Sequence, residues 1–316
     1  MANLEARKYI SADSGFPITL HPHFNEKIKN HVPPEPLREP FTPPKDRAFF
    51  ADPEKKALFS VAKQVDLTES IGTVLENVQL SQLNETQLDE LALLVNERGV
   101  VFFRDQDLTT EKQVELFQHY GILDKHPAQK FVNIKGSRED HREILSYTPW
   151  PSGDFHADTS FEINPPTYSL LRMEEHPEVG GDTAWVSQYG IYDALSDAYK
   201  RFLDGLHAMI PSSIYGVQVL IALRSSTHHP AVRTHPVTKL KALNVNPGFV
   251  TGFAELKKVE SGAPFIALSL VHIKERRRGI RTTVFGEIPY FDPTSESRAE
   301  RKLREESQDD EGVLVV

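Results

Sequence analysis

The chain of 316 residues contains no cysteine, which excludes disulfide bonds and every metal, haem or iron–sulfur site built on thiolates. Any metal must be held by His, Asp, Glu or water. Basic residues are not in excess, since the net charge is −9, and this argues against nucleic-acid partners. No apolar run approaches the ~20 residues of a membrane span, and the first residues lack the core of a signal peptide. We therefore expect a cytoplasmic protein without nucleic-acid or membrane partners.

Three regions differ in composition. Six prolines fall within residues 33–44, which favours an extended chain, so residues 1–60 are predicted to form a Pro-rich N-terminal arm. Residues 294–312 are polar on every face, and residues 294–316 are predicted to form a charged C-terminal tail, either a solvated helix or a disordered end. The segment between them, residues 61–293, is the predicted folded domain.

Within this domain, helices are expected first and short strands afterwards. Asn84 can cap a helix over residues 85–97, with Gln87 at the capping-box position and Gly99 beyond its end. A short strand at 100–103 and a helix at 110–120, stopped by Gly121, should follow. The further predicted elements are strands at 167–173, 183–187, 242–246 and 281–285, and two short helices within 189–205. This order indicates a mostly β fold with flanking helices, such as a jelly roll, rather than a doubly wound sheet.

The first candidate for chemistry is the triplet His156-Ala157-Asp158. In a strand, positions i and i+2 share one face, so an imidazole and a carboxylate at this spacing can reach one cation. The pattern alone is not specific, because the same type of triplet also begins at His141 and at His176. The surrounding sequence has to decide.

The sequence from HADTSFEINPPTYSLLRM to GGDTAWVS resembles the taurine/sulfonate (TauD/TfdA-like) family of Fe(II)- and 2-oxoglutarate-dependent dioxygenases. As in that family, 24 residues separate Asp158 from Thr183 of the GGDT turn. Three more segments are similar, in the family's order: ERGVVFFRDQ (97–106), HPAVRTHPVTKLKALNVNPGF (229–249) and RRGIRTTVFGEIPYF (277–291). The resemblance implies a double-stranded β-helix that uses Fe(II), 2-oxoglutarate and O₂ to oxidise a small anionic substrate.

The resemblance also implies roles for individual residues. His156 and Asp158 look like two ligands of a 2-His-1-carboxylate iron triad. Thr183 and Arg277 resemble the pair that binds the distal carboxylate of 2-oxoglutarate, and His126 and Arg281 resemble the residues that bind a substrate sulfonate. Without the resemblance, Arg277 would be interpreted as part of a solvated basic run and Thr183 as a strand hydroxyl, whereas His126 could equally be a surface histidine.

The resemblance is interrupted ahead of Arg277. The family places its second histidine ligand roughly ten to thirteen residues before that arginine, where this chain has residues 263–266, Ala-Pro-Phe-Ile. His272 is the nearest late histidine and a weak candidate for the missing ligand. The jelly roll is therefore predicted to be incomplete near residues 258–276.

Two functional hypotheses follow. The first is a dioxygenase that hydroxylates a sulfonate or sulfate ester and releases succinate and CO₂. The second is a catalytically impaired pseudo-dioxygenase, or a truncated or mis-spliced product, that binds 2-oxoglutarate or a partner without turnover. The sequence leaves open whether the chain forms a homo-oligomer.

Overall fold

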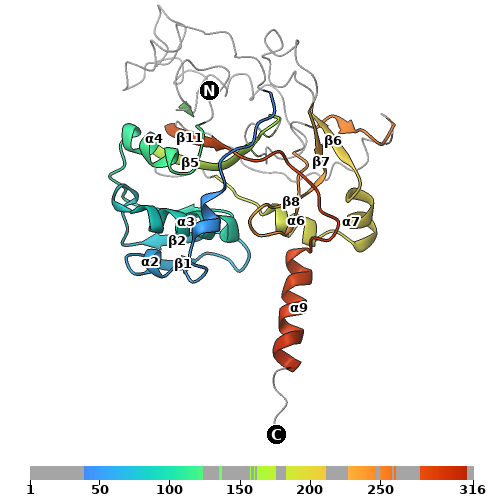
Figure 1. Cartoon of the computed structure of the whole chain (residues 1–316), viewed down its shortest axis with the longest axis horizontal. Coiled ribbons are helices and arrows are strands. Elements are labelled where there is room, and N and C mark those ends of the chain that lie inside the picture. Colours follow the sequence, from blue (N-terminus) through green and yellow to red (C-terminus); the bar gives the residue numbers. More distant parts are fainter. Residues whose placement is uncertain are drawn as a thin grey trace, which may run out of the picture.

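The computed structural model describes residues 39–123, 135–136, 157, 160, 162–175, 183–210, 227–246, 250–257, 260 and 278–311. In the first part of the chain, the elements are η2 (Arg47–Phe50), α2 (Lys56–Phe59), β1 (Lys63–Asp66), β2 (Thr73–Glu76), η3 (Leu80–Gln82), α3 (Glu85–Arg98), β3 (Val101–Phe102) and α4 (Thr110–Gln118). They are followed by β4 (Lys135–Gly136), β5 (Pro166–Glu175), α6 (Gln188–Asp193), α7 (Asp197–Leu203), β6 (His207–Ile210), β7 (Thr227–Pro230), β8 (Val232–Thr234), β9 (Lys241–Leu243), β10 (Gly252–Phe253), β11 (Arg278–Phe285) and α9 (Arg298–Glu311). Figure 1 shows their arrangement.

Helix α3 begins and ends where its sequence predicts. The Asn84 side chain accepts a hydrogen bond from the Gln87 N–H, and the Gln87 side chain accepts one from the Asn84 N–H, both at 3.0 Å. Gly99 follows the helix with φ at 72°, a conformation that favours glycine. The predicted helix over 85–97 is confirmed, because its signals are all local.

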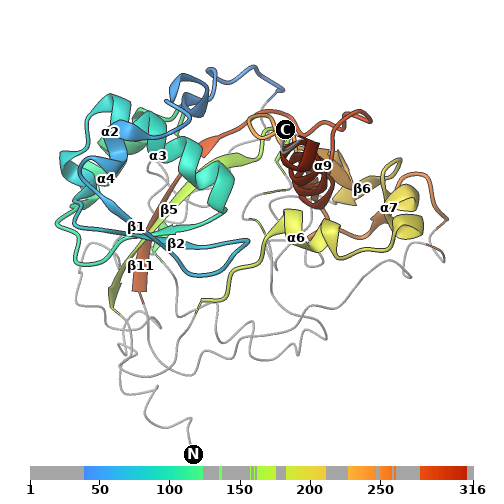
Figure 2. The same cartoon turned by 90° about the horizontal axis from the view of Figure 1, so that it is seen from below.

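Strands β5 and β11 form the longest pair in the described part of the chain. They run antiparallel, with Arg281 opposite Leu171 and Thr283 opposite Ser169, and β4 pairs with the other edge of β11. Helices α3 and α4 cover one face of this pair (Figure 2), where Phe117 and Tyr120 pack with Tyr168 and Val284. The predicted strands at 167–173 and 281–285 are confirmed, and each extends beyond its predicted bounds.

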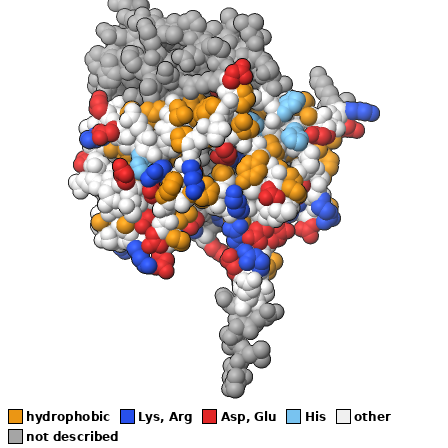
Figure 3. All heavy atoms as spheres, viewed as in Figure 1, with side chains coloured by type: hydrophobic (Ala, Val, Ile, Leu, Met, Phe, Trp, Pro, Cys, Tyr) orange, Lys and Arg blue, Asp and Glu red, His pale blue; other side chains and the backbone are white. Residues whose placement is uncertain are grey.

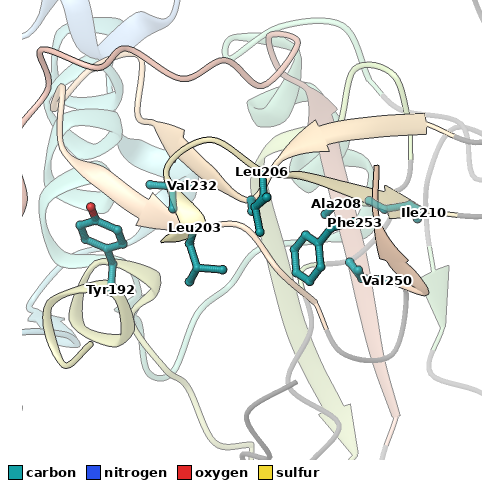
Figure 4. Close-up of a cluster of buried hydrophobic side chains, with 9 residues drawn as sticks. Tyr192, Leu203, Leu206, Ala208, Ile210, Val232, Val250 and Phe253 are labelled. Carbon is teal, nitrogen blue, oxygen red and sulfur yellow. The ribbon is translucent and has the colours of Figure 1, made fainter. Parts of the chain in front are cut away.

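The other sheets are small. Strands β1, β2 and β3 form one, β10, β6 and β7 another, and β8 and β9 a third. Beside them, Tyr192 and Leu203 of the helical segment lie in one apolar cluster with Ala208, Val232 and Phe253 (Figure 4). Strands with helices packed against them agree with the strand-rich, helix-flanked fold class expected from the sequence.

One predicted strand is wrong and another is displaced. Residues 183–187 form an irregular segment that leads into α6, although Thr, Trp and Val favour strands. Trp185 and Val186 are exposed there, so the segment lacks the buried face that would make strand pairing favourable. The strand expected at 242–246 is β9, which ends at Leu243 and is followed by irregular chain.

The described part of the predicted arm, residues 39–60, packs against α3. Leu58 is fully buried, and its N–H donates to the buried carboxylate of Glu90 at 2.6 Å. Arg47 forms a two-pronged ion pair with Asp89 at 2.6 and 2.7 Å. Residues 47–50 and 56–59 are helical, so the prolines do not keep the whole arm extended.

In the predicted tail, α9 projects away from the rest of the described chain (Figure 1). Its first residue, Arg298, is anchored by hydrogen bonds to the carbonyls of Ser70 and Glu97, and its guanidinium lies 4.8 Å from the centre of the Tyr189 ring. No helix in the described residues is long and apolar enough to cross a membrane. On the face drawn in Figure 3, charged and hydrophobic side chains are interspersed.

Candidate functional site

Two of the predicted site residues lie in the described part of the chain. Arg281 is on β11, and Thr183 is exposed in the irregular segment before α6. The others lie outside the described residues: His126, His156, Asp158, His272 and Arg277. Within the described residues there is no group of three or more His, Asp or Glu side chains that could hold a metal ion.

The centre of the predicted metal-binding triplet, Ala157, is described, and its N–H is tied to a distant part of the chain. It donates a 2.9 Å hydrogen bond to Oδ1 of Asn246, which lies just after β9. Nδ2 of Asn246 donates in turn to Oγ of Ser160 at 3.1 Å. The Ser160 N–H donates to the Ala157 carbonyl at 3.3 Å. One buried side chain therefore contacts both Ala157 and Ser160.

Two further side chains form hydrogen bonds that fix described residues after Ser160. Nε2 of His229, on β7, donates to the carbonyl of Glu162 at 2.9 Å. Burial is the main cause that lowers the pKa of His229, so its ring stays neutral at physiological pH. Asn164 donates to the Gly286 carbonyl at 3.0 Å, and it both donates to and accepts from the backbone of Phe41. The described residues Ala157, Ser160, Glu162 and Asn164 are thus held by hydrogen bonds to distant parts of the chain.

Arg281 lies on the face of the β5–β11 pair that α3 and α4 do not cover. Directly paired residues in an antiparallel sheet point to the same side, so Arg281 shares its face with Leu171. Leu171 and its neighbour Met173 are 38% and 39% exposed. On the opposite face, Thr282 accepts a 3.0 Å hydrogen bond from the buried Gln113 of α4. This arrangement gives the face opposite α3 and α4 a cationic side chain beside apolar ones, which suits a small organic anion.

The predicted donor set fits Fe(II) in its chemistry. An imidazole and a carboxylate two positions apart supply two of the three ligands of a facial triad, which leaves coordination positions open for a co-substrate and O₂. Ala157 between them is exposed, while its N–H is bound by a buried amide. The described residue of the triplet, Ala157, is therefore both accessible and held in place.

Residues 63–269 match the model of the family described as "Taurine catabolism dioxygenase TauD, TfdA family". The chain belongs to this family. TauD/TfdA-family enzymes of this kind are α-ketoglutarate (2-oxoglutarate)-dependent dioxygenases that use Fe(II). This confirms the predicted enzyme class, the iron and the 2-oxoglutarate co-substrate at the level of the family.

Among the relatives, a Schizosaccharomyces pombe protein named "Putative alpha-ketoglutarate-dependent sulfonate dioxygenase" is 34% identical over 313 residues, covering 82% of this chain and 78% of that protein. An "Alpha-ketoglutarate-dependent sulfonate dioxygenase" of Saccharomyces cerevisiae is 35% identical over 212 residues, covering 62% of this chain and 52% of that protein. Among solved structures, a taurine dioxygenase from Burkholderia xenovorans superimposes with a TM-score of 0.60 at 24% identity, covering 75% of this chain and 95% of that one. The likeness to this taurine dioxygenase structure shows a similar fold.

Sequence reasoning missed the residues that hold the 157–164 segment: Asn246, His229 and Asn164. The contact between Asn246 and Ala157 joins positions 89 residues apart, and no local pattern indicates it. The only available signal was that Asn246 and His229 both fall within the segment 229–249, which resembles the family.

Proposed function

We propose that the chain hydroxylates the carbon beside a sulfonate or sulfate ester group of a small organic anion. O₂ and 2-oxoglutarate are consumed, and succinate and CO₂ are released. The hydroxylated carbon then expels sulfite or sulfate and becomes an aldehyde. The observation that carries the anionic substrate is Arg281, on the face of the β5–β11 pair opposite α3 and α4, where it shares its face with the exposed apolar side chains of Leu171 and Met173. The names of the two yeast relatives support a sulfonate.

Each predicted site residue has a distinct task in this proposal. His156 and Asp158 hold Fe(II), with His272 the weak candidate for a third ligand. When bound, Fe(II) together with 2-oxoglutarate supplies the oxidising chemistry. Thr183 and Arg277 bind the distal carboxylate of 2-oxoglutarate, because a hydroxyl and a guanidinium fork complement a carboxylate. Arg281 and His126 bind the sulfonate and so orient the neighbouring carbon.

The proposal includes the finer structural and cellular expectations. We propose a double-stranded β-helix, supported by the likeness to the taurine dioxygenase fold. The location is proposed to be the cytoplasm, and the partners to be a small anionic substrate and O₂. A homo-oligomer stays an open prediction.

A second candidate is the pseudo-dioxygenase, which one observation favours. Residues 263–266, where the family has its second histidine ligand, contain no side chain that binds a metal. A chain with only two protein ligands would hold Fe(II) weakly while Thr183 and Arg277 still bound 2-oxoglutarate.

A product assay separates the two candidates. The purified chain is loaded anaerobically with Fe(II) and 2-oxoglutarate, exposed to O₂, and offered an alkylsulfonate, an alkyl sulfate ester or an aryloxy acid. We expect succinate and sulfite, or sulfate, in equal amounts with at least one sulfur-containing substrate, and none from the His156→Ala variant. If the folded chain forms no succinate with any of these substrates, the dioxygenase proposal fails and the pseudo-dioxygenase is favoured.

A further inference from the structure

The side-chain amide of Asn246 is buried, and both its oxygen and its nitrogen form hydrogen bonds. Asn246 is only 3% exposed, and Ser160, which its side chain contacts, is 5% exposed. Burying an amide is unfavourable unless both its oxygen and its nitrogen find partners. Here the oxygen accepts from Ala157 N–H at 2.9 Å, and the nitrogen donates to Ser160 Oγ at 3.1 Å.

The partners fix which way the amide points. A backbone N–H can only donate, so the atom that faces Ala157 must be the amide oxygen. The Ser160 hydroxyl can accept, so it faces the amide nitrogen. The flipped amide would place two donors against each other at Ala157. The side chain therefore has one favourable orientation, which suits a residue that holds a backbone in place.

The backbone that carries Asn246 is itself anchored. The Val250 N–H donates to the Asn246 carbonyl at 3.0 Å, and the Asn244 N–H donates to the Ala231 carbonyl at 2.7 Å. The Asn244 side chain donates to the carbonyl of Pro230 at 3.2 Å. The oxygen that accepts from the Ala157 N–H therefore belongs to a segment that is hydrogen-bonded to the chain around β7 and β8.

Ala157 separates the two predicted iron ligands, His156 and Asp158, in the chain. Because the peptide unit is planar, a bond to the Ala157 N–H also restrains the peptide that links residues 156 and 157. Groups that orient metal ligands contribute to metal affinity even though they do not touch the metal. We propose that Asn246 is a positioning residue, whose hydrogen bond to the Ala157 N–H preorganises the chain between the two predicted iron ligands for Fe(II). This inference rests on the proposed function.

The test measures metal binding rather than turnover. Fe(II) is titrated anaerobically into the full chain with 2-oxoglutarate present, and the visible charge-transfer absorption of the chelate is followed. For Asn246→Ala we expect the dissociation constant for Fe(II) to rise by about 10–100-fold, the range found when outer partners of metal ligands are removed. Ser160→Ala leaves the Ala157 contact in place, so we expect a rise of only a few-fold. This second variant keeps the test usable if Asn246→Ala does not fold.

Asn244→Ala is the matched control. Asn244 is also buried, at 8% exposed, and its side chain also binds a backbone carbonyl, but within the described residues it forms no hydrogen bond to Ala157 or Ser160. We expect Asn244→Ala to lower the melting temperature and to leave the Fe(II) dissociation constant within about twofold. A general loss of stability would instead weaken binding in both variants alike.

Hydrogen exchange in the metal-free chain gives a readout that does not depend on iron. The peptide containing Ala157 should exchange faster in Asn246→Ala and at the wild-type rate in Asn244→Ala. Unchanged exchange in Asn246→Ala, unchanged Fe(II) affinity, or equal weakening in Asn246→Ala and Asn244→Ala would overturn the inference while leaving the proposed function standing. A folded wild type that shows no chelate absorption would overturn the proposed function, and the metal role of Asn246 with it.

Discussion

Replacing Arg281 by alanine is expected to raise the KM for the sulfonate substrate by about 100-fold and to leave the KM for 2-oxoglutarate within about twofold. Hydrogen bonds to a charged group contribute about 1.5–3 kcal/mol, and 1.4 kcal/mol corresponds to a factor of ten in binding. Arg281 pairs with Leu171 on the face of the β5–β11 pair that α3 and α4 do not cover. Steady-state kinetics with each substrate varied in turn measures the two KM values.

Arg172 offers a control on the neighbouring strand. Its guanidinium points to the covered side, where it donates to the Leu108 carbonyl at 2.7 Å and to Thr110 Oγ1 at 3.0 Å. Arg172→Ala should lower stability without changing either KM. Arg281→Lys keeps the charge but loses the two-pronged geometry, so its KM should lie between those of wild type and Arg281→Ala. An unchanged KM for the sulfonate in Arg281→Ala would remove this residue from the substrate site.

Lowering the pH from 6.5 to 4 is expected to reduce the free energy of unfolding by about 3 kcal/mol through His235 alone. Burial, then the nearby charges of Arg233 and Lys239, lower the pKa of His235 to about 3. Its Nδ1 also accepts hydrogen bonds from the N–H groups of Val237 and Thr238, both at 3.3 Å. The neutral ring therefore fits the folded state, and a proton on Nδ1 would remove both bonds.

The sign follows from the lowered pKa. Below pH 6.5 the unfolded chain binds a proton at this histidine and the folded chain does not, down to about pH 3. The stability contributed by His235 is thus complete above pH 6.5 and is lost as the pH falls toward 3.

Urea unfolding between pH 4 and pH 8 measures this effect. His235→Asn keeps an oxygen acceptor near the position of Nδ1 and removes the titration. Its unfolding free energy should fall less steeply with decreasing pH than that of wild type, while comparison at pH 8 isolates the non-ionic cost of the substitution. Parallel pH profiles for the two proteins would show that His235 is not the group responsible.

The elements that could be predicted are those whose signals are local. The capping box of Asn84 and Gln87 defines the start of α3, and Gly99 defines its end. Residues 183–187 have the composition of a strand but form none, because strand formation depends on a partner and a buried face that the segment's own composition does not reveal.

The candidate site was predicted through resemblance, and only part of it lies in the described chain. Arg281 and Thr183 could be named from short matching segments, whereas their surroundings could not. The hydrogen bonds from the Ala157 N–H to Asn246 and from His229 to the Glu162 carbonyl span 89 and 67 residues. Such pairs come together only through the tertiary fold, and one sequence does not indicate them.

We propose above all that this chain holds Fe(II) through His156 and Asp158 and binds 2-oxoglutarate together with it. Anaerobic titration of the purified wild-type chain with Fe(II), in the presence of 2-oxoglutarate, tests it most directly. We expect the visible charge-transfer absorption to saturate at about one iron per chain, as a single facial-triad site requires, and to be absent in His156→Ala. No absorption in a wild-type chain that unfolds cooperatively, or an equal signal in His156→Ala, would contradict the claim.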